Sequence, residues 1–166
     1  MIKLISLLVS KFVGPEIKVE TAEEMFQSTL KSLPADVAIF SAAVCDYKVK
    51  EVSKIKIKKQ DEISLELEKN LDILDYVSNH NSLRPKLVVG FAAETNDLEE
   101  YANKKLNEKN CDWIIANDVS NESIGFDSDF NEVSIFHRDR KIDRLKYKSK
   151  SEISDELVKR IINRLN

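Results

Sequence analysis

The sequence contains few of the residues that cross-link small proteins, bind metals or form glycine-rich loops. Its 166 residues include two cysteines, two histidines and three glycines. Cys45 and Cys111 lie far apart, without a Cys-x-x-Cys or Cys/His spacing, which argues against a disulfide framework and a zinc site. His80 and His137 fall in separate segments and are expected at the surface. Because no Gly-x-Gly-x-x-Gly motif occurs, a dehydrogenase-like dinucleotide binder ranks low.

The chain has no large excess of positive or negative charge and no long apolar run. The formal net charge is −3, so overall electrostatics give no reason to expect binding to nucleic acid or to a membrane surface. The apolar run at residues 1–9 is short and is followed by Gly14-Pro15, so we interpret it as a buried strand and not as a membrane span or signal peptide. The length suits one globular core, and we expect a single cytoplasmic domain over residues 1–166.

Short apolar runs that alternate with helical patterns predict a parallel sheet. Val37–Phe40, Leu87–Val89 and Ile114–Ala116 are continuous apolar runs, typical of strands covered on both faces. Cys111 and Trp113, just before the last run, are expected in the core. The fold class that follows is α/β, with a Rossmann-like three-layer arrangement of a parallel sheet and helices on both faces.

Capping residues predict where the helices begin. Thr21 precedes Glu24 by three positions, the spacing of a capping box. Asn70 is expected to cap a helix that buries Ile73, Leu74 and Val77. A long helix is expected from about residue 98 to residue 110. A C-terminal helix over residues 151–165 is expected to turn these side chains inward: Ile153, Leu157, Ile161, Ile162 and Leu165.

Alternation of apolar and polar residues predicts two antiparallel hairpins. Residues 54–58 and 63–67 alternate strictly, which is typical of half-exposed strands, and residues 133–136 and 142–147 form a second such pair. The first hairpin is rich in lysines, namely Lys48, Lys50, Lys54, Lys56, Lys58 and Lys59. These lysines either form a solvated edge that discourages aggregation or belong to a flap that places ammonium groups against phosphate or a developing oxyanion.

Small and polar residues follow the three buried runs. Ligands of open α/β sheets bind beyond the carboxyl ends of the parallel strands, so residues 41–46, 90–95 and 117–120 are the expected ligand-binding exits. Three carboxylates lie there, Asp46, Glu94 and Asp118. Each alone is as well explained as a solvated loop residue or a helix cap, but their clustering favours a site.

Four further residues near these exits are candidates for ligand contact. Gly90 has no Cβ and permits a close approach of the backbone. Phe91 is suited to contact with a base or sugar. Lys105 and Lys109 lie four apart on one helix face, where they either hold a polyphosphate or pair with neighbouring glutamates.

Six segments, in order and in spacing, resemble the bacterial phosphopantothenoylcysteine synthetase family. They are Thr21-Ala22-Glu23-Glu24-Met25, Ala42-Ala43-Val44-Cys45-Asp46-Tyr47, Lys56-Ile57-Lys58-Lys59, Asn70-Leu71-Asp72-Ile73-Leu74, Gly90-Phe91-Ala92-Ala93-Glu94-Thr95 and Ala116-Asn117-Asp118-Val119. The family usually has alanine at the position of Cys45 and proline at that of Leu71.

The resemblance implies CTP-dependent ligation of 4'-phosphopantothenate to cysteine through an acyl-cytidylate, in coenzyme A biosynthesis, with Mg²⁺ accompanying the triphosphate. It implies that Lys56 is catalytic and stabilises charge at the acyl-phosphate centre. It also implies that the lysine-rich hairpin is a dimerisation flap and the protein a homodimer. The nucleotide-binding positions that it implies are Phe40, Ser41, Ala42, Asp46, Lys56, Leu71, Asp72, Ile73, Leu74, Phe91, Lys105 and Lys109. No metal ligand from the protein is assigned.

The N-terminal part departs from the family pattern. Family members begin this domain with a glycine-rich strand-loop-helix, and nothing equivalent precedes Leu4. Residues 1–166 also do not include the flavin-containing decarboxylase that is often fused upstream in the family. Two hypotheses stay open: a ligase, either alone or completed by a separate N-terminal or decarboxylase chain, and a catalytically incomplete nucleotide-binding or dimerisation module. The choice of CTP over ATP rests on the resemblance alone.

Overall fold

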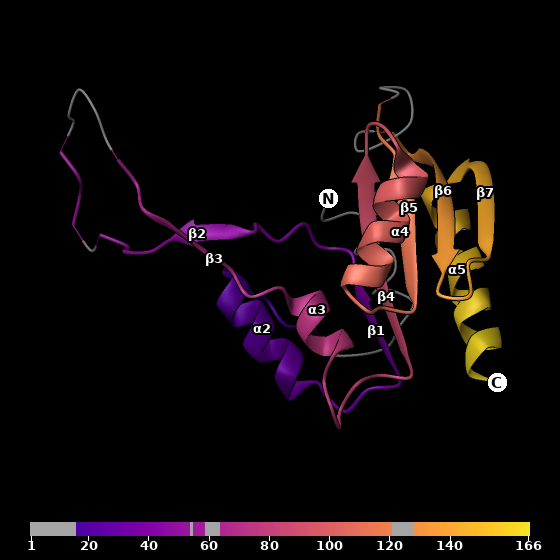
Figure 1. Ribbon diagram of the computed structural model, residues 1–166, viewed down its shortest axis with the longest axis horizontal. Coiled ribbons are helices and arrows are strands. Elements are labelled where there is room, and N and C mark those ends of the chain that lie inside the picture. The colour runs from indigo at the N-terminus through magenta and orange to yellow at the C-terminus, as the bar shows by residue number, and fades with distance from the viewer. Residues whose placement is uncertain (1–15, 54, 59–63, 121–127) are drawn as a thin grey trace.

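A five-stranded mixed sheet forms the body of the protein (Figure 1). The structure is a computed structural model that describes residues 16–53, 55–58, 64–120 and 128–166, so the strand predicted in the apolar run at residues 1–9 lies outside the described residues. The strand order is β1-β4-β5-β6-β7. The strands are β1 (Val37–Phe40), β4 (Leu87–Glu94), β5 (Trp113–Asp118), β6 (Phe130–His137) and β7 (Ile142–Ser149). The first three are parallel, and the predicted hairpin β6–β7 continues the same sheet with antiparallel pairing.

Strands β4 and β5 extend further than the apolar runs predicted. Phe91 pairs with Ile115, and the ladder continues to the pair Glu94 and Asp118. The prediction that residues 90–94 and 117–118 are loop exits is therefore wrong, because each strand supplies the other with backbone partners beyond its apolar segment. Successive side chains there project to opposite faces of the sheet and do not all point into one loop.

Four helices begin close to their predicted positions, and the capping residue differs in one of them. In α2 (Ala22–Lys31), the Thr21 and Glu24 capping box is confirmed. The cap of α3 (Ile73–Ser78) is Asp72, so the prediction that Asn70 caps this helix is wrong. Helix α4 (Leu98–Glu108) has the start that was predicted. Helix α5 (Lys150–Leu165) begins with a second capping box, made by Ser149 and Glu152.

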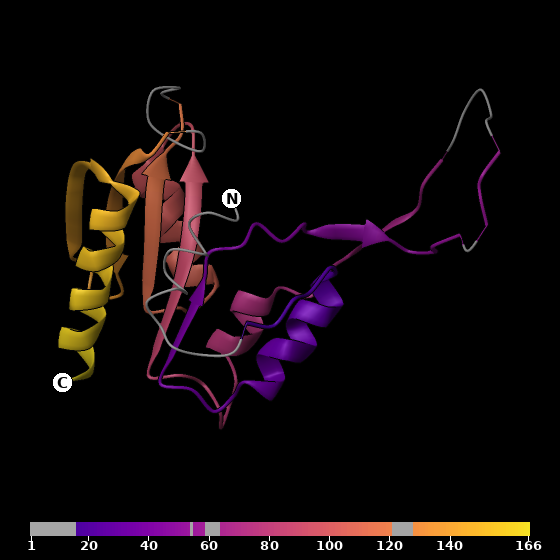
Figure 2. The ribbon, with the colours of Figure 1, turned by 180° about the vertical axis from the view of Figure 1, so that it is seen from behind.

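Helices cover both faces of the sheet, as predicted: α4 lies before the sheet in Figure 1, and α5 lies before it in Figure 2. The α5 face contains one core cluster, which includes Trp113 as predicted, and the α4 face contains the other, which includes Cys111. Ile162 and Leu165 are 51% and 41% exposed, so their predicted inward orientation is wrong. The inward stripe of α5 is formed by residues four apart, Ile153, Leu157 and Ile161, and Ile162 and Leu165 lie off this stripe.

The predicted surface position of His137 is also wrong. Its side chain is 13% exposed, and its ring lies edge-on to Trp113 with a centroid distance of 5.0 Å. The two residues are paired partners on β6 and β5, so their side chains project to the same face. No helix in the described part of the chain is both long and apolar enough to cross a membrane.

A long arm extends from the body between β1 and α3 (Figures 1 and 2). Its root is an antiparallel ladder of β2 (Tyr47–Val49) with β3 (Leu67–Lys69). The prediction of strands at residues 54–58 and 63–67 is wrong for residues 55–58 and 64–66, which are in no strand, while residues 54 and 63 lie outside the described residues. A two-stranded ribbon gains little stability alone in water, which agrees with a ladder of three residue pairs in the described part of the arm.

Candidate functional site

The start of α3 and one face of α4 meet beside the sheet. Asp72 Oδ1 accepts a hydrogen bond of 2.9 Å from the backbone N–H of Asp75, and this contact caps α3. The other carboxylate oxygen of Asp72 lies 2.8 Å from Lys109 Nζ, at the end of α4. Lys109 therefore pairs with a residue distant in sequence and not with a glutamate of its own helix. Two residues that the sequence assigned to nucleotide binding are brought into contact.

The ion pair keeps both groups charged at neutral pH. Burial alone would raise the pKa of Asp72, but the Asp75 amide and the Lys109 ammonium outweigh it and hold this pKa below its usual value. The hydrogen bond to Asp72 raises the pKa of Lys109. Lys109 thus offers a permanent positive charge at the start of α3.

Lys105 lies one turn before Lys109 and contacts β4. Its Nζ donates a hydrogen bond of 2.9 Å to the backbone carbonyl of Phe91. The Phe91 ring projects to the opposite face of the sheet, where it packs against the core cluster below α5. Lys105 and Lys109 are therefore held along one side of α4, Lys105 by the Phe91 carbonyl of β4 and Lys109 by Asp72 at the start of α3.

Gly90 makes room for a helix. A Cβ built on Gly90 would lie 2.7 Å from Leu74 Cδ2 and 2.8 Å from Ile114 Cδ1, well inside van der Waals contact. The space beside the Gly90 backbone is thus filled by Leu74 of α3, so the hypothesis that Gly90 admits a ligand there is wrong. Its missing side chain allows α3 to lie close to β4, and this contact fixes the position of Asp72.

The loop after β1 is joined to the start of α3 through Asn70. Phe40 is half-buried against the α4-side core cluster. Ser41 and Ala42 are half-buried, and Asp46 is exposed. Asn70 joins this loop to the α3 segment, because it donates hydrogen bonds to the carbonyl oxygens of Cys45 and Asp46, each of 2.8 Å.

The remaining predicted residues differ in what they can offer a ligand. Ile73 and Leu74 are buried, so only their backbone groups are available, whereas Leu71 is exposed. Lys56 is exposed on the arm, away from the lysines of α4. Asp118 accepts hydrogen bonds from the Ser120 hydroxyl and the Ser120 backbone N–H, which lower the pKa of Asp118. These bonds correspond to one alternative that the sequence left open for Asp118, a loop carboxylate that caps neighbouring backbone.

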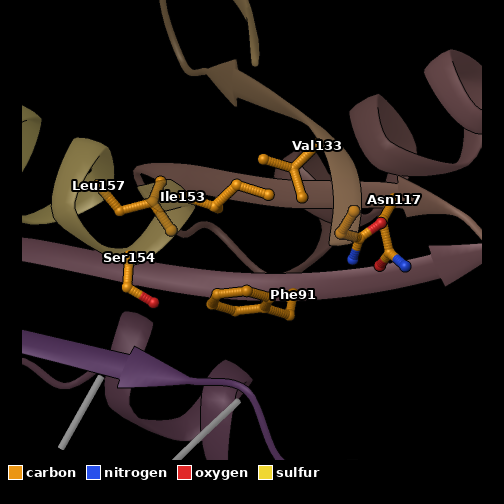
Figure 3. Close-up of a pocket in the computed structure, with 7 residues that line it drawn as sticks. Phe91, Asn117, Val133, Ile153, Ser154 and Leu157 are labelled. Atoms are coloured by element: carbon orange, nitrogen blue, oxygen red, sulfur yellow. The ribbon is translucent and has the colours of Figure 1, made fainter. Parts of the chain in front are cut away.

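A small cavity lies on the α5 face of the sheet (Figure 3). Its volume of about 20 Å³ suits roughly one water molecule. Its lining residues are Phe91, Asn117, Asn131, Val133, Ile153, Ser154 and Leu157. Sequence reasoning missed Asn131, a buried polar residue; the available signal was its inward position in the alternation with Val133 and Ile135. The cavity is too small for a nucleotide.

A partly parallel α/β sheet with lysines and carboxylates gathered beside its strands is typical of proteins that bind phosphorylated small molecules. Residues 6–165 match the family model described as the DNA/pantothenate metabolism flavoprotein C-terminal domain, and the chain belongs to that family. Within the described residues, no group of three or more His, Cys, Asp or Glu side chains could hold a metal ion.

Relatives and solved structures agree with this assignment. The chain is 45% identical over 150 residues to the coenzyme A biosynthesis bifunctional protein CoaBC of Haemophilus influenzae, covering 89% of this chain and 37% of the relative. It is 40% identical over 159 residues to the protein of the same name from Bacillus subtilis, covering 95% of this chain and 39% of the relative. The chain thus spans less than two fifths of these relatives. A crystal structure of the C-terminal domain of CoaBC superposes with a TM-score of 0.69 at 33% identity, over 90% of this chain and 68% of that one.

Proposed function

We propose that this chain binds CTP and takes part in the ligation of 4'-phosphopantothenate to cysteine in coenzyme A biosynthesis. The observation that carries the proposal is the placement of Lys105 and Lys109 beside Asp72, at the sheet edge where α3 begins. Membership in the family, and relatives named for coenzyme A biosynthesis, support this choice among phosphorylated ligands.

The proposed reaction has two steps. A carboxylate oxygen of phosphopantothenate attacks the α-phosphorus of CTP, and the bond from this phosphorus to the bridging oxygen of the β-phosphate breaks, which releases pyrophosphate. The cysteine amine then attacks the acyl carbon of the cytidylate, CMP leaves, and the amine loses a proton. Negative charge develops on phosphate oxygens in the first step, so ammonium groups near them lower the barrier.

The lysines of α4 are the groups that would bind the triphosphate. In the free protein they are held by Asp72 and by the Phe91 carbonyl, so they are already oriented when a ligand arrives. Phosphate oxygens would take over these contacts. Mg²⁺, when bound with the nucleotide, would offset phosphate charge and be held mainly by phosphate oxygens and water.

Asp46 and the arm would complete the site. The exposed carboxylate of Asp46 is suited to polar groups of the nucleoside. Two apolar arm residues, Val52 and Ile55, are 82% and 81% exposed, and burial of such side chains favours association. We propose that the arms pair two copies of the chain in a homodimer and that Lys56 of one copy reaches the site of its partner.

The ligation hypothesis is tested by pyrophosphate release. The protein is supplied with CTP, Mg²⁺, 4'-phosphopantothenate and cysteine, and each substrate is omitted in turn. We expect pyrophosphate release to require both CTP and phosphopantothenate, and phosphopantothenoylcysteine to form only when cysteine is present. CTP binding without pyrophosphate release would instead favour the hypothesis of a catalytically incomplete nucleotide-binding module.

A further inference from the structure

Asn70 links two segments that carry predicted nucleotide contacts. Its backbone N–H donates to the carbonyl oxygen of Asp46, and its side-chain Nδ2 donates to the carbonyl oxygen of Cys45; each distance is 2.8 Å. Both acceptors belong to the loop that leaves β1. Asn70 itself directly precedes Leu71 and Asp72, at the start of α3. Asn70 thus holds the loop after β1 against the segment that begins α3.

The two hydrogen bonds extend the ladder at the root of the arm. The last strand pair is Tyr47 with Lys69, and the bond from the Asn70 backbone to Asp46 adds the next rung. The Asn70 side chain then supplies a donor one residue further along, where the backbone has turned toward α3. Its amide therefore takes the place of a backbone N–H for the Cys45 carbonyl.

Further contacts connect the start of α3 to α4, the helix that carries Lys105. Asp72, two residues after Asn70, pairs with Lys109 of α4. Lys105 of the same helix is bonded to the Phe91 carbonyl. A continuous series of contacts therefore runs from the β1 loop through Asn70 and Asp72 to α4 and β4. Asn70 provides the side-chain link at the loop end of this series.

We propose that Asn70 is a positioning residue of the nucleotide site, which holds the Cys45–Asp46 loop in place before the ligand binds. The proposal rests on the proposed function for the identity of that ligand. Without the Asn70 amide, the loop must be ordered at the moment of binding, and this ordering lowers the affinity. One lost hydrogen bond of this kind is expected to weaken CTP binding about fivefold to tenfold.

The test compares Asn70→Ala and Asn70→Asp with the unaltered protein. The carboxylate of Asn70→Asp has nearly the shape of the amide but cannot donate at neutral pH. Asn103→Ala is a matched control, because the Asn103 amide also donates to a main-chain carbonyl, that of Glu99, but within α4. Backbone hydrogen exchange is measured without ligand, and CTP affinity is measured with Mg²⁺ by calorimetry.

We expect faster exchange at residues 43–48 and 70–74 in both Asn70 variants, weaker CTP binding, and an unchanged melting temperature. Lowering the pH to about 5 protonates part of the introduced carboxyl group, which then donates to the Cys45 carbonyl, so the defect of Asn70→Asp shrinks while that of Asn70→Ala does not. A role limited to general stability would not produce this pH profile.

Two results would overturn the proposal: unchanged exchange in these segments, or CTP affinity equal to that of the unaltered protein in both Asn70 variants. A different outcome bears on the nucleotide itself. If the unaltered protein does not bind CTP but exchange in both segments rises in the variants, the loop-holding role of Asn70 stands and the proposed function is wrong.

Discussion

Replacing Lys56 with glutamine is expected to lower the rate of pyrophosphate release by about 100-fold or more, with a much smaller loss of CTP affinity. The reason is that an ammonium group beside the acyl-phosphate centre contributes most where negative charge develops, in the transition state. Glutamine keeps most of the length of the side chain and removes only the charge. The measurement is steady-state pyrophosphate release, with CTP affinity determined separately.

Lys58→Gln is the matched control for Lys56→Gln. Lys58 is also exposed on the arm, two residues further along, so a general effect of arm charge would appear in both variants. Equal rates for Lys56→Gln and the unaltered protein would contradict the catalytic role of Lys56. If the arm acts on the partner subunit, mixed dimers of Lys56→Gln and Lys109→Gln regain activity, because one of their two sites has both lysines. No recovery would mean that the arm serves its own subunit.

Gly90→Ala is expected to destabilise the fold by about 2 kcal/mol, because the added methyl group overlaps Leu74 and Ile114. Both contacted atoms are ends of buried side chains, so α3 must shift or the side chains must adopt strained rotamers. A loss of this size lowers the melting temperature by roughly 4–8 °C in a domain of this length. CTP affinity should fall as well, since a shift of α3 displaces Asp72 from Lys109.

A double-mutant cycle with Leu74→Ala isolates this contact. Leu74→Ala alone leaves a cavity and costs about 2–5 kcal/mol. Added to that variant, Gly90→Ala should cost less than it does alone, because the overlap with Leu74 is removed and only the overlap with Ile114 remains. Thermal unfolding of the four proteins measures the cycle. Additive effects would mean that Gly90 is not required for the packing of α3.

Local patterns predicted the elements whose causes are local. The apolar runs that contain Val88 and Ile115 identified two buried strands, and the spacing of Thr21 and Glu24 identified a capping box that the structure contains. The ends of β4 and β5 were missed, because they depend on pairing between residues more than 20 positions apart, such as Glu94 and Asp118. Periodicity within one segment contains no information about such a partner.

The candidate site was predicted as a set of residues and not as an arrangement. Resemblance to a known family selected Asp72, Lys105 and Lys109, and the structure brings them together at one edge. The resemblance could not reveal that Asn70 bonds to the preceding loop instead of capping α3. A cap would use the side-chain oxygen of Asn70 as an acceptor, whereas the observed bond uses its side-chain N–H as a donor, and the choice depends on where the loop after β1 lies. The arm shows the same limit, since alternation predicted strands at residues 55–58 and 64–66, which the structure describes as being in no strand.

Calorimetric titration with CTP and Mg²⁺ tests the central claim most directly, namely that the lysines of α4 form the triphosphate site. It compares Lys105→Gln and Lys109→Gln with Lys104→Gln, an exposed neighbour on the same helix. We expect the first two substitutions to weaken CTP binding by about tenfold each, because each removes a charge-assisted contact to phosphate, and Lys104→Gln to leave it unchanged. Equal CTP affinity in all three variants and the unaltered protein would contradict the placement of the nucleotide at this edge.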